Sequence, residues 1–273
     1  MENPKIIVVK CGGSVLNHGQ ELTSLCRNIQ ELNQQEFKVV VVHGGGPEIS
    51  RLLKHFNLPS LFHNGLRVTT AAIAEIAQMA LIGTNNTNLV RLLNKHGISA
   101  CGLSGADGNL LVADYLDWEN LGYVGEVTVV NVYLLNLLLG AGIVPLIAPL
   151  AVDESGNILN INADLAASAI ATALSAHLVL LSDVDGYYAA YPDKNSRISM
   201  LHVSEVNCLL SEDGKVSSGM IPKLQACAKA VTGGVKSACI LNGTEDYFIS
   251  NALTQPGKYG TTIIKEMTSC KSE

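Results

Sequence analysis

Four short segments of the 273-residue sequence combine a tight turn with a polar or cationic side chain near the expected start of a helix. They are Lys10-Cys11-Gly12-Gly13-Ser14, His43-Gly44-Gly45-Gly46-Pro47, Asn160-Ile161-Asn162-Ala163-Asp164 and Gly219-Met220-Ile221-Pro222-Lys223. Backbone amides at a helix start point outward, and the helix dipole adds roughly half a positive charge there. Together with two lysines, these segments indicate a protein that holds two anions together, such as a phosphate and a carboxylate.

The lysine and glycines near the N-terminus fit an anion site at the edge of a sheet. Lys10 is expected at the carboxyl end of the first strand, which is where ligands bind in open parallel sheets. Gly12 and Gly13 would let the backbone approach an anion closely. The segment is not a P-loop, because the lysine precedes the glycines. A glycine turn beside a solvated lysine is the alternative.

The three consecutive glycines at 44–46 are a stronger signal, because such a run loses much backbone entropy on folding. The amides of Gly44 and Gly45 could form a concave anion-binding nest, and Pro47 favours a helical turn directly after it. We interpret His43 as structural rather than catalytic. The alternative for the whole segment is a flexible loop.

Two further groups could bind a carboxylate or organise the lysines. Arg67 follows the turn at Asn64-Gly65, and a guanidinium can clamp a carboxylate with two hydrogen bonds. Asn160 and Asp164 lie among apolar residues, where polar side chains need partners. Asp164 could cap the following helix, or it could hold lysines through charge-assisted hydrogen bonds.

An acidic turn and a second lysine indicate a site for the other anion. The turn at 183–186 (Asp-Val-Asp-Gly) follows an apolar strand pattern. It could border the ribose or base of a nucleotide, contact a metal ion, or be a plain Asp-Gly turn. Lys223 lies in the first turn of a predicted helix, where a cation opposes the helix dipole. This local misfit indicates an anionic partner for Lys223.

These segments need a scaffold of alternating strands and helices. Ile6–Val9 and Lys38–Val42 are β-branched runs typical of buried parallel strands, and helically spaced apolar residues lie between them. Further strands are predicted at 98–101, 110–114, 143–148, 178–181, 237–241 and 261–264, and helices at 47–56, 70–82, 85–96 and 131–139. The alternation predicts an α/β sandwich with a largely parallel sheet. If the protein has two lobes, the boundary falls between residues 158 and 163.

Composition and charge exclude several classes of protein. Apolar residues make up 48% of the chain and charged residues 15%, which indicates a globular protein rather than a disordered one. The net charge of -6 argues against a nucleic-acid-binding surface. The charge-free stretch 127–152 is long enough to span a membrane, but its asparagines, glycines and prolines favour a helix followed by a strand.

The cysteines indicate a reducing compartment. The seven cysteines include no Cys-x-x-Cys pair, so we expect reduced thiols in a cytoplasmic protein and no cysteine metal site. The first strand pattern begins close to Met1, which leaves no room for a signal peptide.

The complete set of segments resembles the amino acid kinase family, from about residue 5 to residue 264. Besides the four segments above, the match includes Asn64-Gly65-Leu66-Arg67-Val68-Thr69 and Gly122-Tyr123-Val124-Gly125. The resemblance implies one domain over residues 1–273, folded as a three-layer αβα sandwich with a central, mainly parallel sheet. Residues 1–160 would form the lobe for acceptor binding and dimerisation, and residues 161–273 the nucleotide-binding lobe.

The resemblance also implies a reaction. ATP, with Mg²⁺, would phosphorylate the side-chain carboxylate of N-acetyl-L-glutamate by direct in-line transfer, the second step of arginine biosynthesis. Lys10 and Lys223 would flank the transferred phosphoryl group, and Asp164 would position both lysines. The acceptor would bind to Gly44, Gly45, Arg67 and Asn160. The nucleotide would bind to Gly12, Gly13, Asp183, Val184, Asp185, Gly186, Tyr187, Tyr188, Lys215, Val216 and Ser217.

Several alternatives remain open within and outside this resemblance. Arginine-inhibited members of the family carry an N-terminal helix for which this sequence leaves no room, so we expect a homodimer that free arginine does not inhibit. The acceptor could instead be N-acetylaminoadipate, N-succinylglutamate, carbamate or aspartate, or the protein could be a non-catalytic sensor of acyl-glutamate or nucleotide. A nicotinamide-binding oxidoreductase is disfavoured, because the G-x-G-x-x-G fingerprint is missing.

Overall fold

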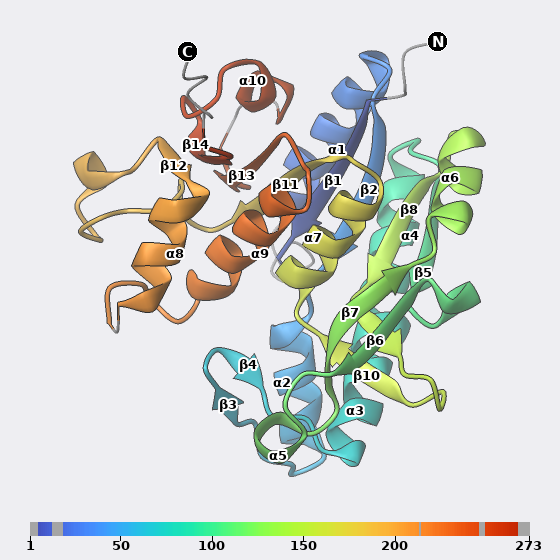
Figure 1. The fold of residues 1–273 in the computed structure, drawn as a ribbon. Helices are drawn as coiled ribbons and strands as arrows, with labels where there is room; N and C mark the ends of the chain where they lie inside the picture. Colours follow the sequence, from blue (N-terminus) through green and yellow to red (C-terminus); the bar gives the residue numbers. More distant parts are fainter. Residues whose placement is uncertain (1–4, 13–18, 213, 246–248, 267–273) are drawn as a thin grey trace, which may run out of the picture.

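A computed structural model of the chain describes residues 5–12, 19–212, 214–245 and 249–266. Its centre is an eight-stranded sheet (Figure 1). In spatial order the strands are β12 (Met200–His202), β14 (Gly260–Ile264), β13 (Ser237–Asn242), β11 (His177–Ser182), β1 (Ile6–Cys11), β2 (Lys38–His43), β8 (Val144–Ala148) and β5 (Ala100–Ser104). Neighbouring strands run parallel except β13 and β14. The predicted α/β class with a mainly parallel sheet is therefore confirmed.

Helices cover both faces of this sheet. Because side chains alternate along a strand, Ile7 and Val9 of β1 face one helical layer and Val8 faces the other. The first layer contains α1 (Gly19–Gln34), α4 (Thr87–Lys95) and α10 (Ile249–Thr254). The second contains α6 (Val132–Gly140), α7 (Ala163–Ala173), α8 (Val203–Ser211) and α9 (Ile221–Thr232). This arrangement is the expected three-layer sandwich.

A smaller, closed sheet of four strands lies in the lower part of Figure 1. It consists of β6 (Leu111–Tyr115), β7 (Val124–Val130), β9 (Leu150–Val152) and β10 (Ile158–Ile161). Beside it lie α2 (Gly46–His55), α3 (Ala71–Gln78), α5 (Trp118–Leu121) and a hairpin of β3 (Phe62–His63) and β4 (Leu66–Arg67). Strand β10 leads directly into the N-terminus of α7, so the small sheet fixes where α7 begins.

One helical region differs from the prediction. The two helices expected at 70–82 and 85–96 form a single run, in which a π-helical segment, η2 (Met79–Asn86), joins α3 to α4. Gly83 lies inside this run without ending it. Long π-helical segments are rare, and π-helical turns often occur at functional sites.

The charge-free stretch 127–152 contains the end of β7, the helix α6 and the strands β8 and β9. Within the part of the chain that the structure describes, no helix is long and apolar enough to cross a membrane. The strands β3, β4, β7, β9, β10 and β12 and the helices α5, α8 and α10 were not predicted. Their burial is partial or their length is short, so their hydrophobic periodicity is weak.

Candidate active site

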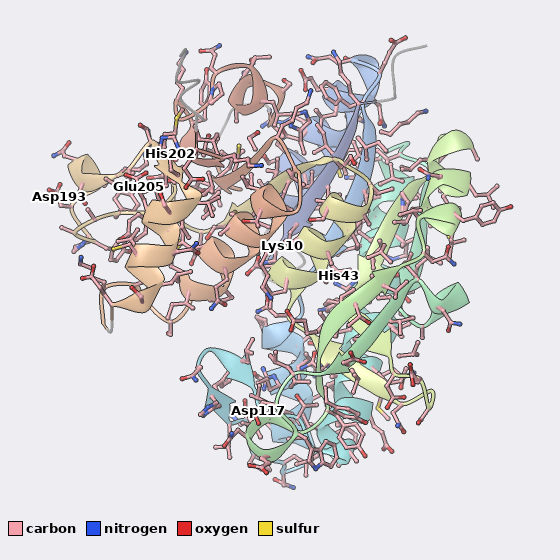
Figure 2. All side chains as sticks on the ribbon, in the orientation of Figure 1. Lys10, His43, Asp117, Asp193, His202 and Glu205 are labelled. Atoms are coloured by element: carbon pink, nitrogen blue, oxygen red, sulfur yellow. The ribbon has the colours of Figure 1, made fainter. Side chains whose placement is uncertain are left out.

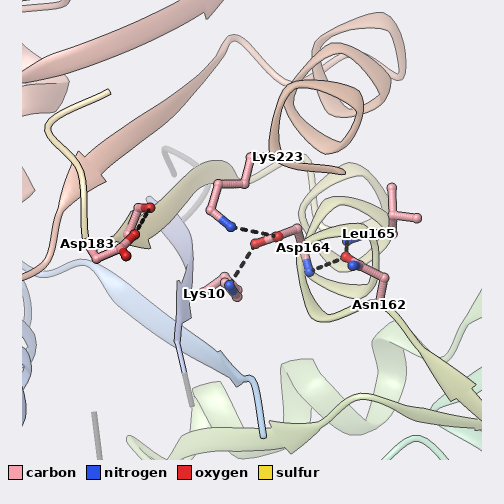
Figure 3. A network of polar contacts seen from close by, with 7 residues as sticks. Lys10, Asn162, Asp164, Leu165, Asp183 and Lys223 are labelled. Atoms are coloured by element: carbon pink, nitrogen blue, oxygen red, sulfur yellow. Dashed lines mark hydrogen bonds and ion pairs between the residues drawn. The ribbon is translucent and has the colours of Figure 1, made fainter. Parts of the chain in front are cut away.

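One carboxylate joins two lysines that come from distant parts of the sequence (Figure 3). Lys10 Nζ lies 2.9 Å from Asp164 Oδ1, and Lys223 Nζ lies 3.2 Å from Asp164 Oδ2. Lys10 and Asp164 are buried, and Lys223 is partly buried. Two cations are thus held around one anion, which leaves positive charge for an anionic ligand.

Three different elements bring these side chains together. Lys10 lies near the end of β1, Lys223 in the first turn of α9 and Asp164 in the first turn of α7. The cap of α7 is Asn162, whose Oδ1 accepts from the amides of Asp164 (2.9 Å) and Leu165 (3.2 Å). Because Asn162 caps the helix, the Asp164 side chain can turn towards the lysines. The sequence allows Asp164 to be a helix cap or a partner of lysines. In the structure it is the partner of the lysines.

The electrostatics of the cluster keep Asp164 ionised. Burial by itself would raise the pKa of the Asp164 carboxyl. The charges of Lys10 and Lys223, with their hydrogen bonds, outweigh that effect and hold the pKa below its ordinary value. At neutral pH the group is therefore an anion that orients two cations, and it has no proton to give.

A cavity of about 280 Å³ lies on the Lys10 side of the cluster. All four predicted acceptor-binding residues line it: Gly44, Gly45, Arg67 and Asn160. Lys10 and Asp164 of the charged cluster line it as well. Its apolar wall includes Ile49, Leu66, Leu81, Val124 and Ile161. The cavity is therefore lined by two cations, Lys10 and Arg67, and by an apolar surface, which suits a small acid.

Arg67 is a buried cation whose hydrogen-bond partners are neutral. Its guanidinium donates to Ser60 Oγ (2.7 Å), Ser50 Oγ (2.9 Å) and the Gly46 carbonyl (3.2 Å), and it lies 4.7 Å from the ring centre of Phe62. No carboxylate among the described residues forms an ion pair with it. A buried charge without a counter-charge is unfavourable, so the site favours a carboxylate ligand.

In the glycine loop after β2, one amide takes part in sheet pairing, and the amides of Gly45 and Gly46 have no acceptor among the described residues. The amide of Gly44 donates to the Cys11 carbonyl at 2.9 Å, so it continues the sheet pairing. The amide of Gly45 has no acceptor among the described residues. Asn160 reaches the same cavity from β10, and its Nδ2 donates to Thr69 Oγ1 at 3.2 Å.

A larger cavity, of about 710 Å³, lies on the Lys223 side. Most of the predicted nucleotide-binding residues line it: Asp183, Val184, Gly186, Tyr187, Tyr188, Lys215 and Ser217. The Asp185 carboxylate does not, because it accepts from Asn242 (2.7 Å) and the Tyr188 hydroxyl (2.6 Å). Val216 is buried in the core. Gly12 lines neither cavity, and Gly13 lies outside the described residues.

Two aromatic residues of the cavities were missed by the sequence reasoning. Phe62 lines the smaller cavity and Tyr191 the larger one, where its ring meets that of Tyr188 edge-on at 5.8 Å. Both side chains are more than half exposed. The available signal in the sequence was an aromatic residue directly before a turn-forming segment, His63-Asn64-Gly65 in one case and Pro192-Asp193 in the other.

Other labelled acidic groups in Figure 2 have local structural roles. Asp117 caps α5, Asp193 caps the short 3₁₀ turn Lys194–Ser196, and Glu205 accepts from the His202 amide at the start of α8. Lys10 lies near the centre of the molecule instead (Figure 2). These caps therefore do not form a second catalytic cluster.

Comparison with known proteins places this arrangement in a family. Residues 5–242 match the profile of the Amino acid kinase family. The chain belongs to the amino acid kinase family. The fold agrees with that membership, as the sequence resemblance predicted.

Relatives within the amino acid kinase family are similar over nearly the whole chain. The acetylglutamate kinase of Bacillus subtilis (strain 168) is 41% identical over 262 residues, which cover 96% of this chain and 97% of that protein. The chloroplastic acetylglutamate kinase of Arabidopsis thaliana is 41% identical over 261 residues, covering 95% of this chain and 75% of that protein. The crystal structure of smu.665 from Streptococcus mutans UA159 has a TM-score of 0.79 at 31% identity, covering 96% and 99% of the two chains.

Proposed function

We propose that this protein is a kinase that transfers the γ-phosphoryl group of ATP to the side-chain carboxylate of N-acetyl-L-glutamate, a step of arginine biosynthesis. The observation that carries the proposal is the position of the Lys10–Asp164–Lys223 cluster. Lys10 lines the smaller cavity, Lys223 lines the larger one, and both contact the same carboxylate. Two anionic ligands would therefore meet at this cluster. The relatives named acetylglutamate kinase support the choice of acceptor.

The smaller cavity would hold the acceptor. Arg67 would clamp its α-carboxylate, because that guanidinium has no carboxylate partner among the described residues. The Gly45 amide and Asn160 would bind its remaining polar groups. The side-chain carboxylate would then point towards Lys10.

The larger cavity would hold ATP, with its phosphates at Lys223. The turn at 183–188 and the segment 215–217 would border the nucleotide. Mg²⁺ would come with ATP and reduce the negative charge of its phosphates. Hydroxyl and carboxylate oxygens of Ser182 and Asp183, which line this cavity, are of the type that Mg²⁺ accepts as ligands.

The reaction needs electrostatic help more than proton transfer. The acceptor carboxylate is ionised at pH 7, so no general base is required. Its oxygen would attack the γ-phosphorus as the bond to the β-phosphate oxygen breaks, and ADP would leave. Two unit charges about 4 Å apart repel by roughly 4 kcal/mol at an effective dielectric constant near 20. Lys10 and Lys223 would offset this repulsion and stabilise the charge on the transferred group.

The proposal extends to the organisation of the protein. Residues 1–160 would bind the acceptor and form a homodimer, and residues 161–273 would bind the nucleotide.

The six cysteines that the structure describes form no disulfides, which supports a cytoplasmic protein. Light scattering coupled to size-exclusion chromatography would test the dimer, and a monomer mass would contradict it.

The function is tested by trapping the acyl phosphate. The protein is incubated with Mg-ATP, hydroxylamine and one of N-acetylglutamate, N-succinylglutamate, N-acetylaminoadipate, glutamate or aspartate. We expect acyl hydroxamate with N-acetylglutamate. Product with another acid only would keep the reaction type and overturn the acceptor. No product with any acid, while ATP still binds, would overturn the catalytic proposal.

A further inference from the structure

A buried hydrogen-bond chain lies behind the glycine loop. His43, the last residue of β2, is fully buried. Its Nδ1 lies 3.0 Å from the Gly44 carbonyl, and its Nε2 lies 3.1 Å from Asn86 Nδ2. Asn86 Nδ2 also donates to the Leu146 carbonyl at 2.8 Å. None of these three side chains (His43, Asn86 and Leu146) lines the acceptor cavity.

This chain fixes the position of the imidazole proton. The Leu146 carbonyl can only accept, so the Asn86 atom facing it is the amide nitrogen. The same nitrogen therefore donates to His43 Nε2, which must be unprotonated. The proton of the neutral ring is on Nδ1 and is donated to the Gly44 carbonyl. Burial lowers the pKa of His43 to about 4, so the ring is neutral near pH 7.

The π-helical segment η2 packs closely against the loop from the same side. Asn85 Nδ2 makes a second, longer contact of 3.4 Å with the Gly44 carbonyl. A Cβ atom at position 45 would lie 2.4 Å from the Leu81 side chain and 2.6 Å from the Asn85 side chain, so any larger residue would have to displace them. The loop therefore contacts η2 at two points, the Gly44 carbonyl and the Cα of Gly45, which has no side chain.

The orientation of one peptide group follows from these contacts. In a trans peptide the carbonyl and the next amide point in opposite directions. The Gly44 carbonyl points inward, to His43 and Asn85. The Gly45 amide consequently points the other way, and Gly45 lines the cavity.

We propose that His43, with its tautomer set by Asn86, is a positioning residue that aims the Gly45 amide at an oxygen of the acceptor. The proposal rests on the proposed function, which places the acceptor in this cavity. His43 itself does not touch the substrate. It acts by holding the peptide plane between Gly44 and Gly45, so the loop needs no rearrangement when the acceptor binds.

The kinetic test compares two substitutions at His43 with a matched control. His43→Leu keeps an apolar volume but removes the donor, while Asn86 retains its bond to Leu146. We expect the acceptor KM to rise about tenfold, the effect of losing one hydrogen bond, with the ATP KM changed by less than about twofold. In His43→Asn, the side-chain amide can donate from the place of Nδ1, so we expect most of the effect to be reversed. His55→Leu, the same change on an exposed histidine of α2, should leave both constants unchanged.

Two results would overturn the positioning role. One is an unchanged acceptor KM in a folded His43→Leu variant. The other is an equal rise of both Michaelis constants without recovery in His43→Asn, because general loosening of the fold would act on both substrates.

A measurement without substrates separates this inference from the proposed function. NMR of the wild-type protein with ¹⁵N-labelled histidine reports which ring nitrogen carries the proton. We expect it on Nδ1 of His43, and a proton on Nε2 would overturn the chain of contacts. If wild-type protein forms no hydroxamate with any acid, the proposed function fails, whereas the observed tautomer still decides how the loop is held.

Discussion

Asp164 is a buried carboxylate. Burial alone would favour its neutral form, but two lysines keep it ionised. A buried ion pair is stabilising only when charges and hydrogen bonds are well matched, and here one carboxylate has a separate oxygen for each lysine. The same contacts stop the two ammonium groups from moving apart. The cluster therefore holds its positive charge in a fixed place before any substrate binds.

The role of Lys10 can be tested by truncation. In Lys10→Ala, we expect kcat to fall by roughly 100- to 1000-fold, because one contact to the charge of the transition state is lost. Steady-state assays of the purified variant measure this, and circular dichroism checks that it is folded. Lys229→Ala, which removes an exposed lysine paired with Glu126, is the control and should retain its activity. Normal turnover in folded Lys10→Ala would exclude the proposed role.

The buried His43 predicts a pH dependence of stability. Its pKa is 6.5 as an ordinary histidine and about 4 when folded, so between these values the unfolded state binds the proton and the folded state does not. Stability should therefore fall as the pH drops from 6.5 to 4, by a contribution on the order of 3 kcal/mol. Urea unfolding across this pH range should show a smaller decrease in the free energy of unfolding for His43→Leu than for wild type. The partly buried His177, whose pKa burial also lowers, contributes equally to both proteins. Equal losses in both proteins would contradict the prediction.

At the scale of elements, the β3–β4 hairpin connects the two sides of the site. Its turn residues, Asn64 and Gly65, have φ values of 49° and 79°, as a two-residue hairpin turn requires. A Cβ atom at Gly65 would lie 3.0 Å from the carbonyl oxygen of Ser218, in the loop before α9. The hairpin that carries Arg67 therefore reaches the loop that precedes Lys223.

Arg67→Ala should separate binding of the two substrates. We expect the acceptor KM to rise at least tenfold, while the ATP KM changes by less than about threefold, because the guanidinium lies in the smaller cavity. The matched control is Arg51→Ala, since Arg51 is exposed and pairs with Glu48 on α2. Initial rates with each substrate varied in turn provide the measurement. Equal increases of both constants would argue against a carboxylate clamp.

At the scale of the whole molecule, the two proposed lobes share one sheet and one core. Strand β1 pairs with β2 on one side and with β11 on the other. One hydrophobic cluster includes Val40 of β2, Leu178 of β11 and Ala166 of α7. No boundary in the described core separates residues before 160 from those after it.

This continuity predicts cooperative unfolding. The single tryptophan, Trp118, lies in α5, on the part of the chain assigned to acceptor binding. Far-UV circular dichroism reports on all the helices. When unfolding in urea is followed by Trp118 fluorescence and by far-UV circular dichroism, we expect the two midpoints to coincide. The shared core must open as one unit. Two separated midpoints would mean that the lobes unfold independently.

The sequence by itself determined the features that depend on neighbouring residues. β-branched runs predicted the buried strands β1 and β2, and the glycine run with Pro47 predicted the loop and the start of α2. Such patterns are reliable because backbone preference and burial act over a few residues. The motifs also predicted which residues gather around the two cavities, with the differences at Asp185, Val216 and Gly12 described above.

Only the tertiary structure decided how isolated polar groups are paired. The sequence allowed Asp164 to be a helix cap or a partner of lysines, and the choice depends on Asn162 and on two lysines from β1 and α9. It also left open that the Gly44 amide is used by Cys11, and that His43 and Asn86, far apart in sequence, share a hydrogen bond. These contacts arise when the sheet order brings distant segments together. A lone charge or amide has no periodicity that would reveal its partner in advance.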